Sequence, residues 1–375
     1  MSRRALVATL GIAAVAVGGA LGGVLAVGGS AKVNLSANSE HTDHWHGSRL
    51  SSSLAFATVK NPGDPTFNQL LGINNRDQIA GYFGSGAAGH PNKGYVLNVS
   101  RRSAFFQNEN FPFGVQTQVI GINDRGVTVG FWSNQNTASQ TNANFGFYSW
   151  HGRFHNVNFP TGNNASPPVN QLLGVNNSDI AVGFYTDAKG NDHAYEYSIF
   201  GNWFHRIHVP GAKSVTASGI NNRRDIAGFY VDRGGVTRGF LWWDGNLARL
   251  SFPGATSTMA FGVNDEREVV GTYMTGSGNN AKSFGFTWTA QTGFRTVNAP
   301  LGVGATTLNG INDAGDLVGF YTDAAGNTDG LVAAPTRSRP SFMPRMNQTM
   351  TPITTPMVPA NTTAPVPSGA GPTHF

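Results

Sequence analysis

Hydrophobic and polar residues alternate over short segments between residues 54 and 334, and apolar residues do not recur there at helical spacing. The segments 154–160 and 294–300 show the alternation, and each ends at a proline. A period of two residues is typical of β-strands with one buried face. Only 12% of the residues are charged, whereas glycine, asparagine and phenylalanine abound, which favours short strands joined by tight turns. The pattern predicts an all-β protein.

One motif recurs six times in this region. It reads glycine, isoleucine or valine, asparagine, and then a second glycine nine positions after the first. The copies begin at Gly72, Gly121, Gly174, Gly219, Gly262 and Gly310. Subtracting these positions gives spacings of 49, 53, 45, 43 and 48 residues, which is the size of a propeller blade.

The motif itself predicts a β-hairpin. An apolar strand ends at the asparagine, whose side-chain oxygen can bond to the backbone and shape the turn. These turn residues are Asn74, Asn123, Asn176, Asn221, Asn264 and Asn312. The second strand then begins just before the second glycine, where the lack of a side chain would let a neighbouring aromatic ring or backbone approach closely.

Two more strands complete each unit and predict how the chain closes. A strand beginning with glycine and an aromatic residue is followed by a strand that ends in proline. Residues 54–62 form such a fourth strand without the first three, and the last copy ends at 330–333 without a fourth. Pairing the two ends removes two exposed sheet edges. We therefore predict a six-bladed β-propeller of four-stranded blades over residues 54–335, closed by strands from both ends.

The segments outside the propeller have other compositions. Arg3 and Arg4 precede an uncharged run up to Ala31, which is typical of a cleaved signal peptide or, alternatively, of a retained membrane anchor. We expect residues 32–53 to be a linker and the Pro-, Thr- and Met-rich residues 336–375 to be a disordered tail. Either interpretation of residues 1–31 places the propeller outside the cytoplasm, with membrane contact only through a retained N-terminal segment.

The repeats resemble the extracellular HAF repeat family of bacterial exported proteins. The resemblance covers residues 54–334 and rests on the Gly-Ile-Asn motif with its second glycine. The His-Ala-Phe strand start of that family is matched most closely by His193-Ala194-Tyr195, and other copies depart from it, as at Arg238-Gly239-Phe240. The resemblance implies an exported protein and no particular activity, so it assigns no catalytic residue.

Composition excludes several kinds of chemistry. The net charge of +5 comes largely from arginines outside the repeats, so the repeat region lacks the basic surface that nucleic acid requires. There is no cysteine, which excludes disulfides, thiolate metal sites and a cysteine nucleophile. No cofactor is expected, because no phosphate-binding loop or catalytic motif occurs.

Metal binding has one candidate cluster. His41, His44 and His46 could bind Zn²⁺, Cu²⁺ or Ni²⁺, or they could be solvated residues of the linker. The loops 187–192 and 323–329 superficially look like calcium loops, but they lack the required carboxylate spacing and are interpreted as turns.

Ligand binding is expected on the face that carries the loops of variable length. The stretch from the second glycine to the start of the third strand varies between copies, and it includes Trp132 and Asn134. Three positions before the first glycine, on the strand expected to be innermost, five copies carry a polar residue. These are Gln69, Gln118, Gln171, Thr216 and Thr307. They could line a wet channel, or they could only satisfy neighbouring backbone groups.

The sequence thus favours an exported, non-catalytic binding or scaffold propeller that recognises a glycan or another component of the cell envelope. The alternative is a lyase or hydrolase with its active site at the mouth of the channel, an idea that rests on fold analogy.

Overall fold

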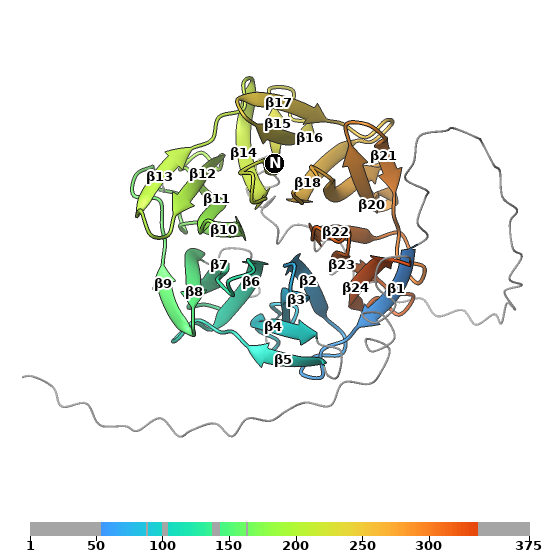
Figure 1. Ribbon diagram of the computed structural model, residues 1–375, viewed down its shortest axis with the longest axis horizontal. Coiled ribbons are helices and arrows are strands. Elements are labelled where there is room, and N and C mark those ends of the chain that lie inside the picture. The colour runs from blue at the N-terminus through green and yellow to red at the C-terminus, as the bar shows by residue number, and fades with distance from the viewer. Residues whose placement is uncertain (1–53, 88, 100–103, 137–142, 163, 337–375) are drawn as a thin grey trace, which may run out of the picture.

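The computed structural model confirms the predicted architecture (Figure 1). It describes residues 54–336 except 88, 100–103, 137–142 and 163. Six four-stranded antiparallel sheets are arranged around one axis. The predicted signal or anchor segment, the linker with its histidines, and the tail beyond residue 336 lie outside the described residues.

Five blades take their strands in chain order from the axis outward, and the sixth takes β22, β23, β24 and then β1 (Figure 1). The inner strands are β2 (Asn68–Ile73), β6 (Gln116–Ile122), β10 (Asn170–Val175), β14 (Ala212–Ile220), β18 (Ser257–Val263) and β22 (Thr306–Ile311). The second strands are β3 (Gln78–Phe83), β7 (Thr128–Ser133), β11 (Ile180–Thr186), β15 (Ile226–Asp232), β19 (Val269–Thr275) and β23 (Leu317–Thr322). The third strands are β4 (Lys93–Val99), β8 (Phe145–Trp150), β12 (Asp192–Ser198), β16 (Thr237–Trp243), β20 (Lys282–Thr289) and β24 (Thr328–Pro335). The outer strands are β5 (Ala104–Asn108), β9 (Arg153–Asn156), β13 (Trp203–Arg206), β17 (Asn246–Leu250), β21 (Gly293–Thr296) and β1 (Leu54–Val59).

The first and last strands of the chain share one blade. β1 pairs with β24 in antiparallel register from Leu54 opposite Pro335 to Val59 opposite Gly330. The sixth blade is therefore built from both ends of the propeller, as the sequence predicts. This pairing closes the ring and covers the edges that β1 and β24 would otherwise expose.

The antiparallel order divides the ring into two faces. All turns from first to second strand and from third to fourth strand lie on one side, which we call the turn face. All connections from second to third strand and from one blade to the next lie on the other side, the loop face. The described residues include one helical element, the short 3₁₀ turn η2 (Gly278–Asn280), and they contain no helix long and apolar enough to cross a bilayer.

A β-bulge in every inner strand explains the second glycine of the motif. In the second blade the register shifts between Val119 and Gly121, and the strand presses its backbone against the neighbouring strand. A Cβ on Gly130 would lie 2.0 Å from the carbonyl oxygen of Gln118. The same carbonyl approach occurs in the other five blades, which confirms the predicted close approach.

The first glycine of the motif is required for a different contact. A Cβ on Gly219 would lie 2.5 Å from the carbonyl oxygen of Phe261 and 3.1 Å from the Cα of Gly262 in the next blade. Every first glycine faces the first glycine of the following blade in this way. Six glycines thus let the inner strands touch around the axis, a role that the sequence analysis did not identify.

The motif asparagines both shape the turns and join the blades. The side-chain oxygen of Asn176 accepts hydrogen bonds from the backbone N–H groups of Ser178 (3.0 Å) and Ile180 (3.1 Å), as predicted. Its amide nitrogen donates to the carbonyl oxygen of Asn221 in the next blade at 3.0 Å. All six asparagines repeat the second bond, and the bond from Asn312 to Asn74 closes the circle at 3.4 Å.

The double role of the motif asparagine predicts that aspartate is not tolerated in its place. In Asn221→Asp the amide donor to the carbonyl oxygen of Asn264 (2.8 Å) is lost, and a carboxylate is placed beside the buried Asp225. We expect the free energy of unfolding to fall by about 3 kcal/mol, measured by chemical denaturation with tryptophan fluorescence. The control is Asn222→Asp, because Asn222 is exposed and three other copies carry aspartate at that place (Asp124, Asp265 and Asp313). The control should change stability by less than about 1 kcal/mol; equal losses in both variants would contradict the assigned role.

Candidate functional site

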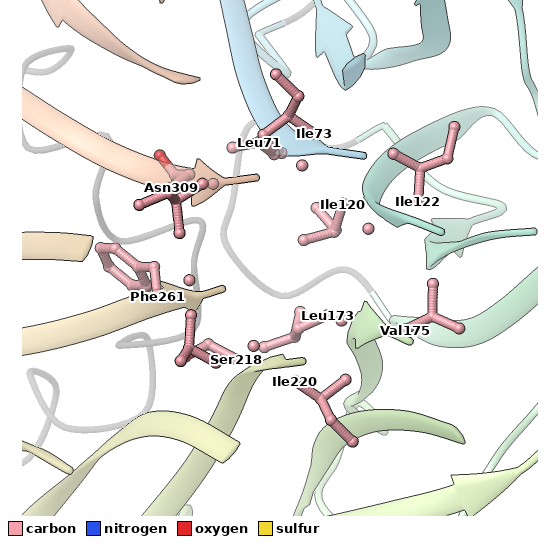
Figure 2. A pocket seen from close by; sticks show the side chains of 18 residues that line it. Leu71, Ile73, Ile120, Ile122, Leu173, Val175, Ser218, Ile220, Phe261 and Asn309 are labelled. Atoms are coloured by element: carbon pink, nitrogen blue, oxygen red, sulfur yellow. The ribbon is translucent and has the colours of Figure 1, made fainter. Parts of the chain in front are cut away.

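A cavity of about 80 Å³ lies on the axis between the inner strands (Figure 2). Its wall combines mainly apolar side chains with the backbone of the six first glycines of the motif. The extra residues of the six bulges belong to it: Leu71, Ile120, Leu173, Ser218, Phe261 and Asn309. The cavity opens to the turn face between the six motif asparagines and the residues that follow them. The axis is therefore a narrow shaft of mixed apolar side chains and glycine backbone, with a polar mouth.

The polar residues predicted for the channel are all buried, and three of them bond to the preceding blade. Gln118 donates from its amide nitrogen to the side-chain oxygen of Asn92 in the preceding blade at 2.8 Å, and Gln171 donates to Asn144 at 2.7 Å. The Thr216 hydroxyl donates to Asp192 at 3.2 Å. Gln69 and Thr307 are buried at the same strand position. None of the five is among the residues that line the cavity in Figure 2, and a ligand role for them stays a prediction.

The two predicted loop-face residues differ in their surroundings. Trp132 stacks on Phe111 with ring centroids 4.3 Å apart and an interplanar angle of 2°. Its indole N–H donates to the side-chain oxygen of Asn156 at 2.7 Å. Asn134 is exposed on the loop that follows. Trp132 therefore has one ring face stacked on Phe111, the Phe145 ring 5.1 Å away and its polar atom engaged, and its contact with a ligand stays a prediction.

The turn face carries an aromatic cluster that the sequence analysis missed. Trp150, Phe200 and Trp203 have exposed fractions of 39%, 62% and 39%. Trp150 ends β8, Trp203 begins β13, and Phe200 lies in the turn between β12 and β13. The rings of Trp150 and Phe200 are 6.0 Å apart across the boundary between the second and third blades. The exposed His151 is adjacent to Trp150, with ring centroids 4.8 Å apart. The only sequence signal was a large aromatic residue at a turn, where polar residues are usual.

Two arginines flank the aromatic cluster and are held by buried carboxylates. Arg125 bonds to Asp179 in the next blade, and its guanidinium lies 5.6 Å from the Phe200 ring. Arg224 makes a two-pronged bond to Glu196 in the preceding blade, at 2.8 and 3.0 Å, and lies 5.6 Å from the Trp203 ring. Hydrogen bonding by Glu196 raises the pKa of Arg224. Both guanidiniums are thus fixed beside aromatic rings, with half of each arginine side chain open to water.

Asp192 is a carboxyl group of the loop face whose pKa is raised toward neutral pH. It lines a small pocket on the loop face between the third and fourth blades, together with Lys213 and Ser214. Burial raises its pKa to about 6, against the bonds that it accepts from Thr186 and Thr216. The nearby Asp187 differs: despite partial burial, bonds from His193 and from backbone N–H groups lower its pKa to about 2.

Metal binding has no support within the described ranges. The residues of 54–336 that the structure describes contain no group of three or more His, Asp or Glu side chains able to hold an ion. The two calcium-like loops behave as turns. Asp187 accepts bonds from Lys189 and Asn191 in its own loop, and Asp323 accepts bonds from Ala325 and Asn327. His41, His44 and His46 lie outside the described residues.

Comparisons with known proteins extend to the fold alone. No family model and no curated protein matches the sequence. A protein of unknown function from Dyadobacter fermentans DSM 18053 is similar in structure, with 9% identity, a TM-score of 0.49 and coverage of 76% of this chain and 99% of that one. TolB from Acinetobacter baumannii has 10% identity and a TM-score of 0.42, with coverage of 76% of this chain and 64% of the TolB chain. A lectin from Aleuria aurantia, in complex with Fucalpha1-6GlcNAc, has 8% identity and a TM-score of 0.41, with coverage of 71% of this chain and 91% of the lectin chain.

The raised pKa of Asp192 predicts a pH-dependent stability. A carboxyl whose pKa rises from 3.8 to about 6 on folding destabilises the folded state once it ionises. The destabilisation is absent below about pH 4 and complete above about pH 6. Asp192→Asn should therefore be about 3 kcal/mol more stable than the wild type at pH 7 and similar to it at pH 4. Asparagine already occupies the same place in two other blades, as Asn92 and Asn144. Denaturant unfolding at both pH values measures the difference, and a gap independent of pH would contradict the assigned burial effect.

Proposed function

We propose that the protein is a non-catalytic, glycan-binding β-propeller that works outside the cytoplasm. The carrying observation is the aromatic cluster on the turn face, in which Trp150, Phe200 and Trp203 are exposed together beside two fixed arginines. Exposed apolar side chains that gather on one face usually mark an interaction site. Tryptophan and arginine are also the side chains that most often dominate binding energies.

The chemistry of the cluster suits a sugar better than an aliphatic ligand. One side of a pyranose ring carries C–H groups that pack on an aromatic face, while its hydroxyls need donors and acceptors at the rim. Here the rim is formed by the guanidiniums of Arg125 and Arg224 and by the imidazole of His151. Because both guanidiniums are already held by buried carboxylates, little side-chain freedom would be lost on binding.

This proposal moves the binding surface away from the loop face that the sequence favoured. On the loop face Trp132 is partly covered and Phe113 is a single isolated ring, whereas the turn face presents three exposed rings from two neighbouring blades. Export, and membership of the HAF repeat family, remain part of the proposal. They rest on the apolar N-terminal segment and on the Gly-Ile-Asn repeats.

A lyase or hydrolase remains the second candidate, favoured by one observation. Asp187 and Asp192 are neighbouring carboxyl groups whose pKa values are pushed apart, to about 2 and about 6. Such a separation of pKa values can mark an acid and base pair. The pocket beside Asp192 is small, about 20 Å³, so a substrate would have to bind and react at the rim of the pocket.

Screening the full chain against a panel of glycans tests the proposal. Trp150→Ala and Phe200→Ala should each weaken binding at least about tenfold, since each removes an aromatic face from the cluster. The matched control is Phe113→Ser, which removes an exposed aromatic ring from the loop face and should leave glycan affinity unchanged. Affinity lost only in the control variant would overturn the assigned surface. Turnover of a bound glycan that Asp192→Asn abolishes would favour the enzyme.

A further inference from the structure

The loop face carries a second set of exposed apolar residues, different in kind from the aromatic cluster. Five of the eight large apolar side chains that are exposed in the described chain lie on this face, and the three others form the aromatic cluster. Four of the five come from two loops that join consecutive blades: Phe113 and Val115 between β5 and β6, and Leu301 and Val303 between β21 and β22. Their exposed fractions are 99%, 38%, 67% and 56%.

The two loops share a sequence that the fold does not require. Each runs proline, bulky apolar residue, glycine, valine, at 112–115 and 300–303. Directly after the corresponding proline, the other four junctions carry Gly63, Thr161, Gly211 and Gly254. Phe113 even adopts a left-handed backbone, with φ of 67°, which costs energy for a bulky side chain. The equivalent Gly211 and Gly254 are also left-handed, so this turn favours glycine, and the fully exposed phenylalanine ring does not pack within the fold.

A lysine lies beside each of the two loops, whose exposed apolar residues we call the apolar tips (Phe113 with Val115, and Leu301 with Val303). The ammonium group of Lys93, which begins β4, donates to the carbonyl oxygen of Val115 at 3.0 Å. The exposed Lys282, which begins β20, packs its methylene groups beside Gly304, 3.7 Å from where a Cβ on that glycine would lie. Asp323 follows Thr322, whose carbonyl oxygen accepts a hydrogen bond from the backbone N–H of Val303 in the second loop. The carboxylate of Asp323 is tied to its own turn and to Lys60. Each tip thus combines apolar side chains with a cation at their base.

We propose that the loop face docks on an anionic lipid bilayer, with Phe113 and Leu301 inserted among the headgroups. Apolar side chains enter the headgroup and acyl boundary while lysines remain at the level of the lipid phosphates. The sixth and first blades lie between the two loops, so the tips give two separate points of contact on one face. A glycan would not explain them, because they offer aliphatic groups and one isolated ring without a polar rim. The inference is independent of the proposed glycan binding, which uses the opposite face.

Environment-sensitive fluorophores on single cysteines test the docking, because the chain has no cysteine of its own. Phe113→Cys, Leu301→Cys and, on the turn face, Phe200→Cys would each be labelled in the full chain. With vesicles of phosphatidylcholine and phosphatidylglycerol, the labels at 113 and 301 should shift to the blue and be quenched by a lipid-borne quencher, while the label at 200 should do neither. If the N-terminal segment alone holds the protein on the vesicle, none of the three labels will shift, and the proposal is overturned.

Two sets of variants in the unlabelled chain complete the test. Phe113→Ser with Leu301→Ser should lower the vesicle partition coefficient at least about tenfold, with the unfolding temperature unchanged because both side chains are exposed. Lys93→Gln and Lys282→Gln should each lower it about fivefold on anionic vesicles and leave binding to pure phosphatidylcholine unaltered. A blue shift at 113 and 301 that grows with protein concentration without vesicles would instead identify a second copy of the chain as the partner and overturn the lipid assignment.

Discussion

The hydrogen bond from each motif asparagine to the next blade is the contact on which the ring depends. It works because a primary amide has an acceptor and a donor at its end. The oxygen holds the turn of its own blade while the nitrogen reaches the neighbouring carbonyl, as Asn176 does toward Asn221. The contact also requires the inner strands to touch, which the glycine at the start of each motif permits. Asparagine and glycine therefore recur together because the close approach at the glycine lets the asparagine reach the next blade.

The closed ring determines where function can lie. Around the axis the residues are fixed by inter-blade bonds, and even the polar side chains of the inner strands are buried between blades. Freedom of sequence remains in the outer turns and in the loops between blades. The aromatic cluster lies at the outer turns, and the apolar tips at residues 113 and 301 lie in the loops between blades. The turn face and the loop face therefore carry two different surfaces that point in opposite directions. A propeller resting on lipid through its loop face would present the turn face outward, toward glycans.

Local spacing in the sequence was sufficient to predict the fold. A second glycine nine residues after the first in six copies, and a fourth strand left over at the start, predict the blade number and the closure between β1 and β24. The turn role of the asparagine oxygen was also predictable, because it involves residues two and four positions away. The loops at 187–192 and 323–329 were recognisable as turns for the same reason. Each of these features depends on neighbours along the chain or on the repeat itself.

Only the tertiary structure decided the contacts between blades. The asparagine nitrogen bonds to a carbonyl 43 or more residues away. Gln118 and Gln171 bond to the preceding blade and are not among the residues that line the axial cavity of Figure 2. Trp150 meets Phe200 across a blade boundary, and Asp192 is enclosed by its own blade and the next. These contacts depend on the width of the ring and the twist of each sheet, which set distances between residues that no sequence interval reveals. The sequence thus specified the parts and their number, and the packing of one blade on the next determined which side chains are exposed.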